Sequence, residues 1–140
     1  MENRALIFLS YARKDKDRVV DLYQRLFNEG HKPWMDVRDI LPGENFRLAI
    51  ESAIHRADFF IAVLSSNSVD RRGFIQRELK QALDIWKENL ESDIYLIPLR
   101  LEECESPPGL RDFQRVDLFD NDGWTRLLEA LKEGTRRKTE

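Results

Sequence analysis

The sequence contains few of the residues on which most enzymes rely for chemistry. It has one cysteine, Cys104, and two histidines, His31 and His55, among its 140 residues. A single cysteine excludes an intramolecular disulfide and a cysteine-based zinc site, and it favours a reducing, cytoplasmic location. Two isolated histidines leave little material for a metal centre or a Ser-His or Cys-His nucleophile. We therefore expect no metal-binding residues.

Long apolar runs and an excess of one charge are also missing. No segment approaches the ~20 apolar residues that a membrane span needs, and the N-terminus has no signal-peptide pattern, so no membrane partner is expected. Lys and Arg number 23 against 26 Asp and Glu, a net charge of −3. This balance argues against a nucleic-acid partner, because such proteins neutralise phosphates with basic side chains. Charged residues nevertheless make up 35% of the chain, above the roughly 25% of average proteins.

The sequence lacks the motifs of three nucleotide- or phosphate-dependent classes of protein. The sequence has neither G-x-G-x-x-G nor a Walker A loop, which excludes a conventional dinucleotide fold or P-loop NTPase. A phosphoacceptor receiver domain needs acidic residues after its first and third strands. This chain has Ser10-Tyr11 and Ser65-Ser66 at those points.

What the sequence does contain is an alternation of short apolar runs with amphipathic segments. The pattern predicts strands near 5–9, 31–36, 57–64, 94–99 and 114–119, and helices through 19–27, 44–56, 74–88 and 124–131. Gly30 is expected to end the first helix, and Pro98 suggests that the fourth strand frays or lies towards an edge.

Continuous apolar strands joined by helices are typical of a parallel sheet that is buried on both faces. We predict an α/β, flavodoxin-like doubly wound sandwich, with a central five-stranded parallel sheet and helices on both faces. It would form one domain over residues 1–134, followed by a charged, frayed tail at 135–140. Ligands in such sheets bind beyond the carboxyl ends of the strands, here Ser10-Tyr11, Asp36 and Ser65-Ser66.

Four ordered motifs resemble the Toll/interleukin-1 receptor (TIR) domain family, and its bacterial members most. Residues 8–15 (FLSYARKD) are similar to the family's first box, FISYxxxD. Residues 34–44 (WMDVRDILPGE) resemble the second box, called the BB loop, and residues 57–65 (ADFFIAVLS) resemble the strand that ends in VLS. Residues 77–79 (REL) are similar to the helix that carries the family's W..xE element. The resemblance covers about residues 5–131.

The resemblance implies one of two functions. Some TIR domains are adaptors, whereas others cleave NAD⁺ at the nicotinamide–ribose bond and release nicotinamide with ADP-ribose or a cyclic isomer. NAD⁺ is then the substrate and no cofactor is implied, and residue-by-residue matching makes Glu78 the essential carboxylate. The chemistry agrees, because nicotinamide leaves as a neutral group from a cationic substrate. It therefore needs no general acid, and one carboxylate suffices to stabilise the oxocarbenium-like centre.

Helical geometry gives a separate view of Glu78. Ile75, Leu79, Ala82 and Trp86 form the expected buried stripe of their helix. At about 100° per residue Glu78 lies about 60° from the centre of that stripe, a border position from which a charge can face a cleft. The alternative is an ordinary solvated glutamate.

The substrate-binding residues implied by the resemblance and the strand ends are Ser10, Tyr11, Arg13, Asp36, Gly43, Phe46, Ser65 and Phe74. Simpler roles compete with ligand binding at several of them. Ser10 and Tyr11 suit capping or packing as well as NAD⁺ contacts. Arg13 suits a pyrophosphate or a surface ion pair. Asp36 is better placed to brace the following loop than to bind the ribose, and Phe46 is expected in the core.

The BB loop is the expected contact with other TIR domains. Its tip, Ile40, Leu41, Pro42 and Gly43, is apolar between charged neighbours, a pattern typical of an interface. In the NAD⁺-cleaving members such docking completes the active site, so this chain is expected to self-associate when active. The alternative is a loop that packs on its own sheet.

Two residues depart from the pattern of the enzymatic members, so membership of the family does not by itself imply activity. Phe74 stands four residues before Glu78, where those members often have tryptophan, and Ala12 replaces an arginine-like residue after Tyr11. Two hypotheses follow. The first is a self-association-gated NAD⁺ glycohydrolase of bacterial defence or stress signalling, and the second is a non-catalytic interaction module.

Overall fold

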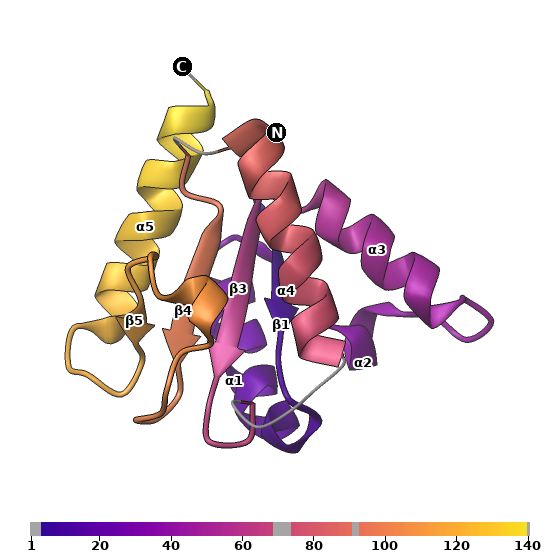
Figure 1. Cartoon of the computed structure of the whole chain (residues 1–140), viewed down its shortest axis with the longest axis horizontal. Helices are drawn as coiled ribbons and strands as arrows, with labels where there is room; N and C mark the ends of the chain where they lie inside the picture. The colour runs from indigo at the N-terminus through magenta and orange to yellow at the C-terminus, as the bar shows by residue number, and fades with distance from the viewer. Residues whose placement is uncertain (1–3, 69–73, 91–92, 140) are drawn as a thin grey trace.

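Five short strands form one parallel sheet in the computed structural model (Figure 1), which describes residues 4–68, 74–90 and 93–139. The strands are β1 (Leu6–Ser10), β2 (Lys32–Trp34), β3 (Phe59–Leu64), β4 (Leu96–Arg100) and β5 (Val116–Asp117), in the spatial order β2-β1-β3-β4-β5. Every neighbouring pair is parallel. The predicted flavodoxin-like sheet is confirmed, and its strand order reverses between β1 and β3.

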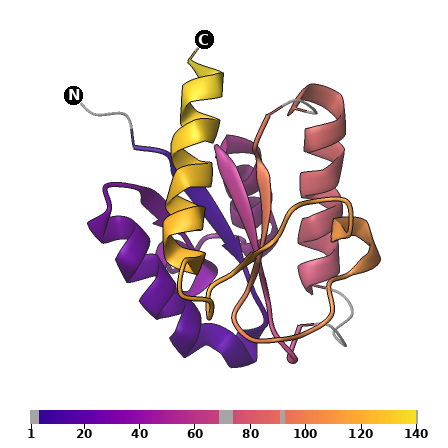
Figure 2. The ribbon, with the colours of Figure 1, turned by 90° about the vertical axis from the view of Figure 1, so that its left-hand side faces the viewer.

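Helices cover both faces of the sheet (Figure 2). They are α1 (Lys16–Asn28), α2 (Asp36–Asp39), α3 (Phe46–Arg56), α4 (Phe74–Ile85) and α5 (Gly123–Lys138). The helices α1 and α5 pack on one face, and α3 and α4 pack on the other. A π-helical turn at Trp86–Leu90 extends α4, and 3₁₀ turns occupy Arg13–Asp15 and Pro108–Leu110. Within the described ranges no helix has the length and apolarity to cross a membrane.

The alternation of side chains along each strand divides the core in two. On the α3/α4 face, the ring of Phe8 stacks between those of Trp34 and Phe60, with centroids 5.1 and 5.2 Å away. These three residues are direct neighbours in the strand register. On the other face, Ile7 and Leu9 pack with buried residues of α1 and α5. Both faces of β1 are therefore apolar, which explains its continuous rather than alternating sequence pattern.

The expected boundaries hold best where an element lies at the centre of the sheet. The two outer strands, β2 and β5, are shorter than the expected 31–36 and 114–119. Pro98 pairs with Ala62 of β3, and β5 extends only alongside Leu99 and Arg100. At Pro98 the strand therefore has one paired neighbour, where the missing N–H of proline costs no ladder hydrogen bond.

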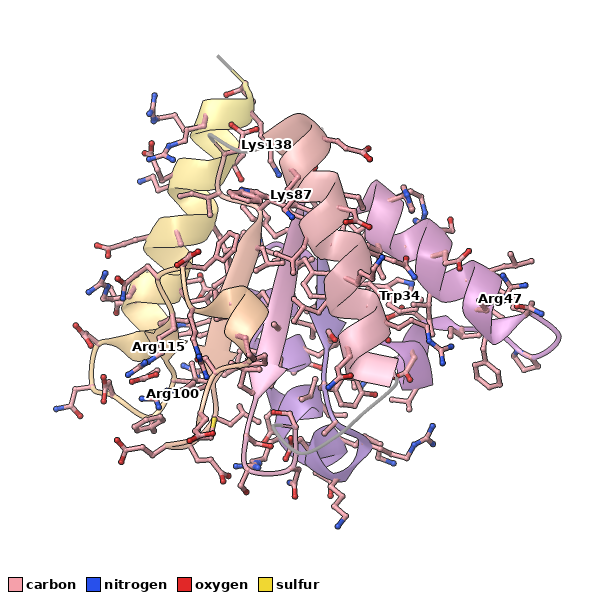
Figure 3. The ribbon with its side chains drawn as sticks, in the orientation of Figure 1. Trp34, Arg47, Lys87, Arg100, Arg115 and Lys138 are labelled. Atoms are coloured by element: carbon pink, nitrogen blue, oxygen red, sulfur yellow. The ribbon has the colours of Figure 1, made fainter. Side chains whose placement is uncertain are left out.

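The segment expected to be a frayed tail is instead the last turn of a helix. Residues 135–138 continue α5, where the ammonium of Lys138 donates a hydrogen bond to the carbonyl of Asp58 and lies 4.2 Å from the centroid of the Phe59 ring (Figure 3). A Cβ added to Gly134 would lie 2.5 Å from Phe59 Cε1, so the helix approaches β3 closely there. These contacts hold the last turn against the sheet.

Candidate active site

Four of the predicted site residues meet at the carboxyl edge of the sheet. Ser10 ends β1, Tyr11 follows it, Asp36 begins α2, and Glu78 lies in the second turn of α4. Since α4 runs back from the carboxyl edge of the sheet, its first turns stand over the strand ends, close to α2 (Figure 1). The site therefore lies beside the point where the strand order reverses, where ligands of such sheets bind.

Glu78 is buried rather than placed at an open border. The residue is only 3% exposed, and its Oε1 atom has no hydrogen-bond partner. Loss of water around the carboxylate raises the pKa of Glu78 to about 8, an effect that the negative charge of Asp36 increases and the nearby Ser10 hydroxyl moderates. The expected border position was wrong because α4 packs against both α3 and β1, with Ser10 at the end of β1 close to the carboxyl. A buried carboxyl with an unused oxygen is a group that a ligand can complete.

Tyr11 and Asp36 join the two loops next to Glu78. The Tyr11 hydroxyl donates a short hydrogen bond to Asp36 Oδ1, and the same oxygen accepts the backbone N–H of Val37 at 2.8 Å. Burial, this bond and the charges of Asp36 and Glu78 all raise the pKa of Tyr11, so it stays a neutral donor. Asp36 therefore braces the start of the BB loop, as its sequence position indicated.

Ser10 differs from Tyr11 in having no such partner. Its residue is 1% exposed, and its Oγ makes no hydrogen bond. A hydroxyl is both donor and acceptor, so a buried one without a partner is available to a ligand. The Ser10 hydroxyl is nevertheless close enough to Glu78 to lower the pKa of its carboxyl, so the two polar groups lie together at the same edge.

Ser65 has a different environment, which sequence reasoning did not find. Its hydroxyl donates to Asp15 Oδ2 at 2.5 Å and accepts the N–H of Asn67 at 3.0 Å. The buried Asp15 also accepts from Asn67 Nδ2 and from Arg18. The first box contains Asp15, but no periodicity signals that a residue after β1 will anchor the loop after β3. The Ser65 hydroxyl serves this loop contact instead of facing a ligand.

The remaining predicted residues are dispersed. Arg13 is exposed, within electrostatic reach of the Tyr11 hydroxyl. Phe46 is the first residue of α3 and is 71% exposed, which corrects its expected place in the core. The first turn of α3 extends past the sheet (Figure 1), so no layer covers it. Phe74 begins α4, but its side chain lies outside the described part of the chain.

The BB loop contains a turn of helix that its sequence did not predict. Residues 36–39 form α2, and Leu41 to Glu44 then form a tight turn in which the Glu44 N–H donates to the Leu41 carbonyl at 3.0 Å. Gly43 has φ +95°, the conformation that the third residue of a type II turn requires. The Glu44 carboxylate accepts the Leu41 N–H at 2.7 Å. In this structure the role of Gly43 is conformational.

Two cavities lie away from Glu78. One of about 550 Å³ is lined by residues between Ser106 and Arg126, beside β5, and another of about 270 Å³ runs along α3 from Asn45 to Arg56, next to Trp34. In the described residues no three His, Cys, Asp or Glu side chains cluster as metal ligands would. Glu78 lines neither of these cavities and is itself buried among the described residues.

The comparison with known families agrees with this architecture. Residues 7–132 match the model of the TIR domain family. The chain belongs to that family. The TIR domain of the Toll-related receptor TRR-2 from Hydra magnipapillata has the same fold, with a TM-score of 0.75 at 24% identity, covering 90% of this chain and 97% of that one.

Two curated bacterial proteins resemble this TIR domain in sequence. The uncharacterised protein y4cD of Sinorhizobium fredii is 32% identical over 84% of this chain and 19% of its own length. The 2′ cyclic ADP-D-ribose synthase BtTIR of Bacteroides thetaiotaomicron is 29% identical over 62% of this chain and 34% of its own. The TIR domain therefore spans about a fifth to a third of the curated relatives that it matches.

Proposed function

We propose that this TIR domain cleaves NAD⁺ at the nicotinamide–ribose bond, with Glu78 as the catalytic carboxylate. The observation that carries the proposal is the buried Oε1 of Glu78, which has no partner and lies at the carboxyl edge of the sheet. Its neighbours Ser10 and Tyr11 add polar groups at the same edge. The similarity to a 2′ cyclic ADP-D-ribose synthase supports the substrate class.

The reaction requires a single negative charge in a dry environment. The C1′–N bond breaks with its electron pair going to the pyridinium nitrogen, and nicotinamide departs neutral while positive charge develops on the ribose. A carboxylate beside that ribose stabilises the charge, more strongly when water is excluded. Water, or a hydroxyl of the same molecule, then adds to C1′ and releases a proton. ADP-ribose or a cyclic isomer results.

The ionisation of Glu78 fits a gated enzyme. With a pKa raised to about 8, its carboxyl is mostly neutral at pH 7 in the resting chain. A cationic nicotinamide next to it favours the charged form, because an opposite charge lowers the pKa of a carboxyl. Substrate binding and formation of the catalytic carboxylate are therefore coupled.

Self-association through the BB loop is proposed as the event that opens the enclosed site. Leu41 at the tip of the loop is 64% exposed, and Pro42 and Gly43 beside it are exposed too, with Ile40 half-buried at the base. The loop is tied to the site through the Tyr11–Asp36 hydrogen bond, so docking at the tip is mechanically connected to Glu78. We place the activity in the cytoplasm, in bacterial defence or stress signalling, where loss of NAD⁺ stops growth.

The test is nicotinamide release from NAD⁺ over a wide range of protein concentration. Glu78→Gln is compared with Asp84→Asn, an exposed acidic residue of the same helix. We expect release by the wild type that rises more steeply than linearly with concentration. Asp84→Asn is expected to behave like the wild type, and Glu78→Gln to release none. Equal release by both variants would exclude Glu78 as the catalytic group.

A non-catalytic interaction module is the second candidate, because the exposed apolar residues also suit binding alone. Leu41, Phe46 and Leu48 are 64%, 71% and 56% exposed around one loop and the start of α3. If this candidate holds, substitution of Leu41 or Pro42 abolishes partner binding. In addition, NAD⁺ is then not consumed under any crowded or self-associating condition.

A further inference from the structure

A second buried oxygen without a partner lies on the same helix as Glu78. Gln81 follows Glu78 by three residues in α4, and its Oε1 is buried with no hydrogen bond. It is the carbonyl oxygen of this amide, not the amide nitrogen, that is buried without a partner. Residues three apart on a helix lie on the same side, about 5–6 Å between their Cβ atoms. The carboxyl of Glu78 is therefore within reach of the Gln81 side chain.

The two oxygens cannot satisfy one another while both are acceptors. A carboxylate oxygen and an amide oxygen both only accept, whereas a neutral carboxyl carries one O–H donor. A proton on Glu78 thus gives the Gln81 carbonyl the donor that it lacks. This single proton removes the cost of burying two unpaired acceptors, each of which is unfavourable.

The opposite side of Glu78 offers a donor instead of an acceptor. Ser10, at the end of β1, is buried, and its hydroxyl favours the charged form of Glu78. Among the described residues, the negative charge of Asp36 in α2 raises the pKa of this carboxyl, and Glu78 in turn raises the pKa of Tyr11 after β1. On the neighbouring helix α3, the buried face is apolar and consists of Ile50, Ala53 and Ile54. Glu78 therefore lies between a donor on the sheet and an acceptor on its own helix.

We propose that Gln81 is a positioning residue for Glu78, whose carbonyl accepts a hydrogen bond from the neutral carboxyl across one turn of α4. The inference rests on the proposed function for its catalytic meaning, since it describes how the resting site keeps its carboxyl neutral. Loss of that hydrogen bond, when substrate or Ser10 takes over the carboxyl, accompanies formation of the charged catalytic group.

The experiment follows the protonation of Glu78 directly, without NAD⁺. The side-chain carboxyl carbons are labelled with ¹³C, the Glu78 signal is assigned by its loss in Glu78→Gln, and its titration midpoint is measured in the folded chain. Gln81→Met keeps the length of the side chain and removes the acceptor, which is expected to lower the midpoint by about half to one pH unit. Ser10→Ala removes the donor on the other side and is expected to raise it.

Gln76→Met is the matched control, because Gln76 is an exposed glutamine of the same helix and its loss should leave the midpoint unchanged. Gln81→Ala serves as a second variant if methionine disturbs the packing between α3 and α4. An unchanged or raised midpoint in the folded Gln81 variants would overturn the proposal. That result is independent of NAD⁺ cleavage, and inactivity of the wild type with the expected midpoint shifts would overturn only the proposed function.

Discussion

The Tyr11 hydroxyl donates its hydrogen bond to Asp36, so the end of β1 is fastened to the first residue of the BB loop. Glu78 is close enough to this pair for its charge to raise the pKa of Tyr11. The Tyr11–Asp36 contact therefore lies between Glu78 and the BB loop, the candidate surface for partner docking. Several measurable consequences depend on this arrangement and on its surroundings.

Replacing Tyr11 by phenylalanine should remove this connection with little change in packing volume. We expect a loss of about 1 kcal/mol in the free energy of unfolding, the usual contribution of one hydrogen bond, measured by urea denaturation. Tyr23→Phe is a matched control, because the Tyr23 hydroxyl reaches Asp39 Oδ1 at a longer 3.3 Å. A larger loss in the control than in Tyr11→Phe would contradict the importance assigned to the Tyr11–Asp36 bond.

Glu78→Gln should stabilise the chain in a pH-dependent way. The pKa of Glu78 is raised from an ordinary 4.5 to about 8. Between pH 4.5 and pH 8 the folded chain therefore keeps a proton that the unfolded chain has lost. Wild-type stability therefore falls as pH rises from 4.5 to 8, whereas glutamine does not titrate. Relative to the wild type, the melting temperature of the variant should gain roughly 5 °C or more on going from pH 5 to pH 8. Asp84→Asn should show no such pH dependence.

The rate of NAD⁺ cleavage should follow the same ionisation. Only the carboxylate form of Glu78 stabilises a positive ribose, so kcat/KM should rise about tenfold per pH unit at low pH and level off near pH 8. The measurement is nicotinamide release at subsaturating NAD⁺ from pH 5.5 to 9. A profile that is flat over this range would show that a group with an ordinary carboxyl pKa, or no carboxyl, controls the reaction.

The ion pair of Arg100 and Asp117 should matter to stability and not to the site. Arg100 is 5% exposed and binds both oxygens of Asp117, at 2.6 and 2.7 Å, and it lowers the pKa of that carboxyl. Arg100→Met removes the buried partner of Asp117 and leaves it only the exposed Arg115, 3.3 Å from Oδ1, with an expected cost of about 3 kcal/mol near neutral pH. The lowered pKa of Asp117 means that the pair stabilises the folded chain above the ordinary pKa of aspartate, and that this stabilisation is lost as the pH falls. The free energies of unfolding of variant and wild type should therefore converge in acid.

The control for Arg100→Met is a variant that breaks an exposed ion pair. In Arg47→Ala the lost contact to Glu51 is 3.9 Å long and exposed, so the change should stay within about 0.5 kcal/mol. Urea denaturation at pH 7 and pH 3 measures both variants. A similar loss in both would contradict a special role for the buried pair.

Substituting Leu41 by aspartate should weaken self-association without unfolding the chain. The side chain is 64% exposed, so its loss removes little from the core. We expect a protein concentration at least about tenfold higher to be needed before NAD⁺ cleavage starts. A tenfold loss of affinity corresponds to roughly 1.4 kcal/mol at an interface. Phe27→Asp is the control, because Phe27 is 49% exposed on α1 and away from the BB loop. Equal effects of both would indicate non-specific association.

Local pattern was sufficient for the central elements of the fold. The strands β1 and β3 and the helix α3 lie within a few residues of their expected bounds, because continuous apolar runs and helical spacing are properties of neighbouring residues. Gly30, expected to end the first helix, has the positive φ of +95° that such a cap uses. The outer strands were overestimated, because pairing on only one side determines how far an edge strand extends.

Burial of single side chains was decided by neighbours that are distant in the sequence. Phe46 has the right spacing for the stripe of α3, yet the first turn of that helix extends past the sheet and leaves it exposed. Glu78 has the spacing of a border residue, yet it is buried, near Ser10 of β1 and within the electrostatic influence of Asp36 of α2. Helical periodicity describes the faces of one helix and holds no information about which other elements pack against them.

The scarcity of cysteine and histidine, the strand-and-helix alternation and the four ordered motifs determined the class of fold and singled out Glu78. Only the tertiary structure decided the state of that residue, a buried carboxyl with an unused oxygen, facing Ser10 and one turn from the unpaired carbonyl of Gln81. It also decided that Ser65 is bound to Asp15. The reason is physical: desolvation and hydrogen-bond partners depend on all atoms within a few ångströms, and those atoms come from β1, α2 and α4 together.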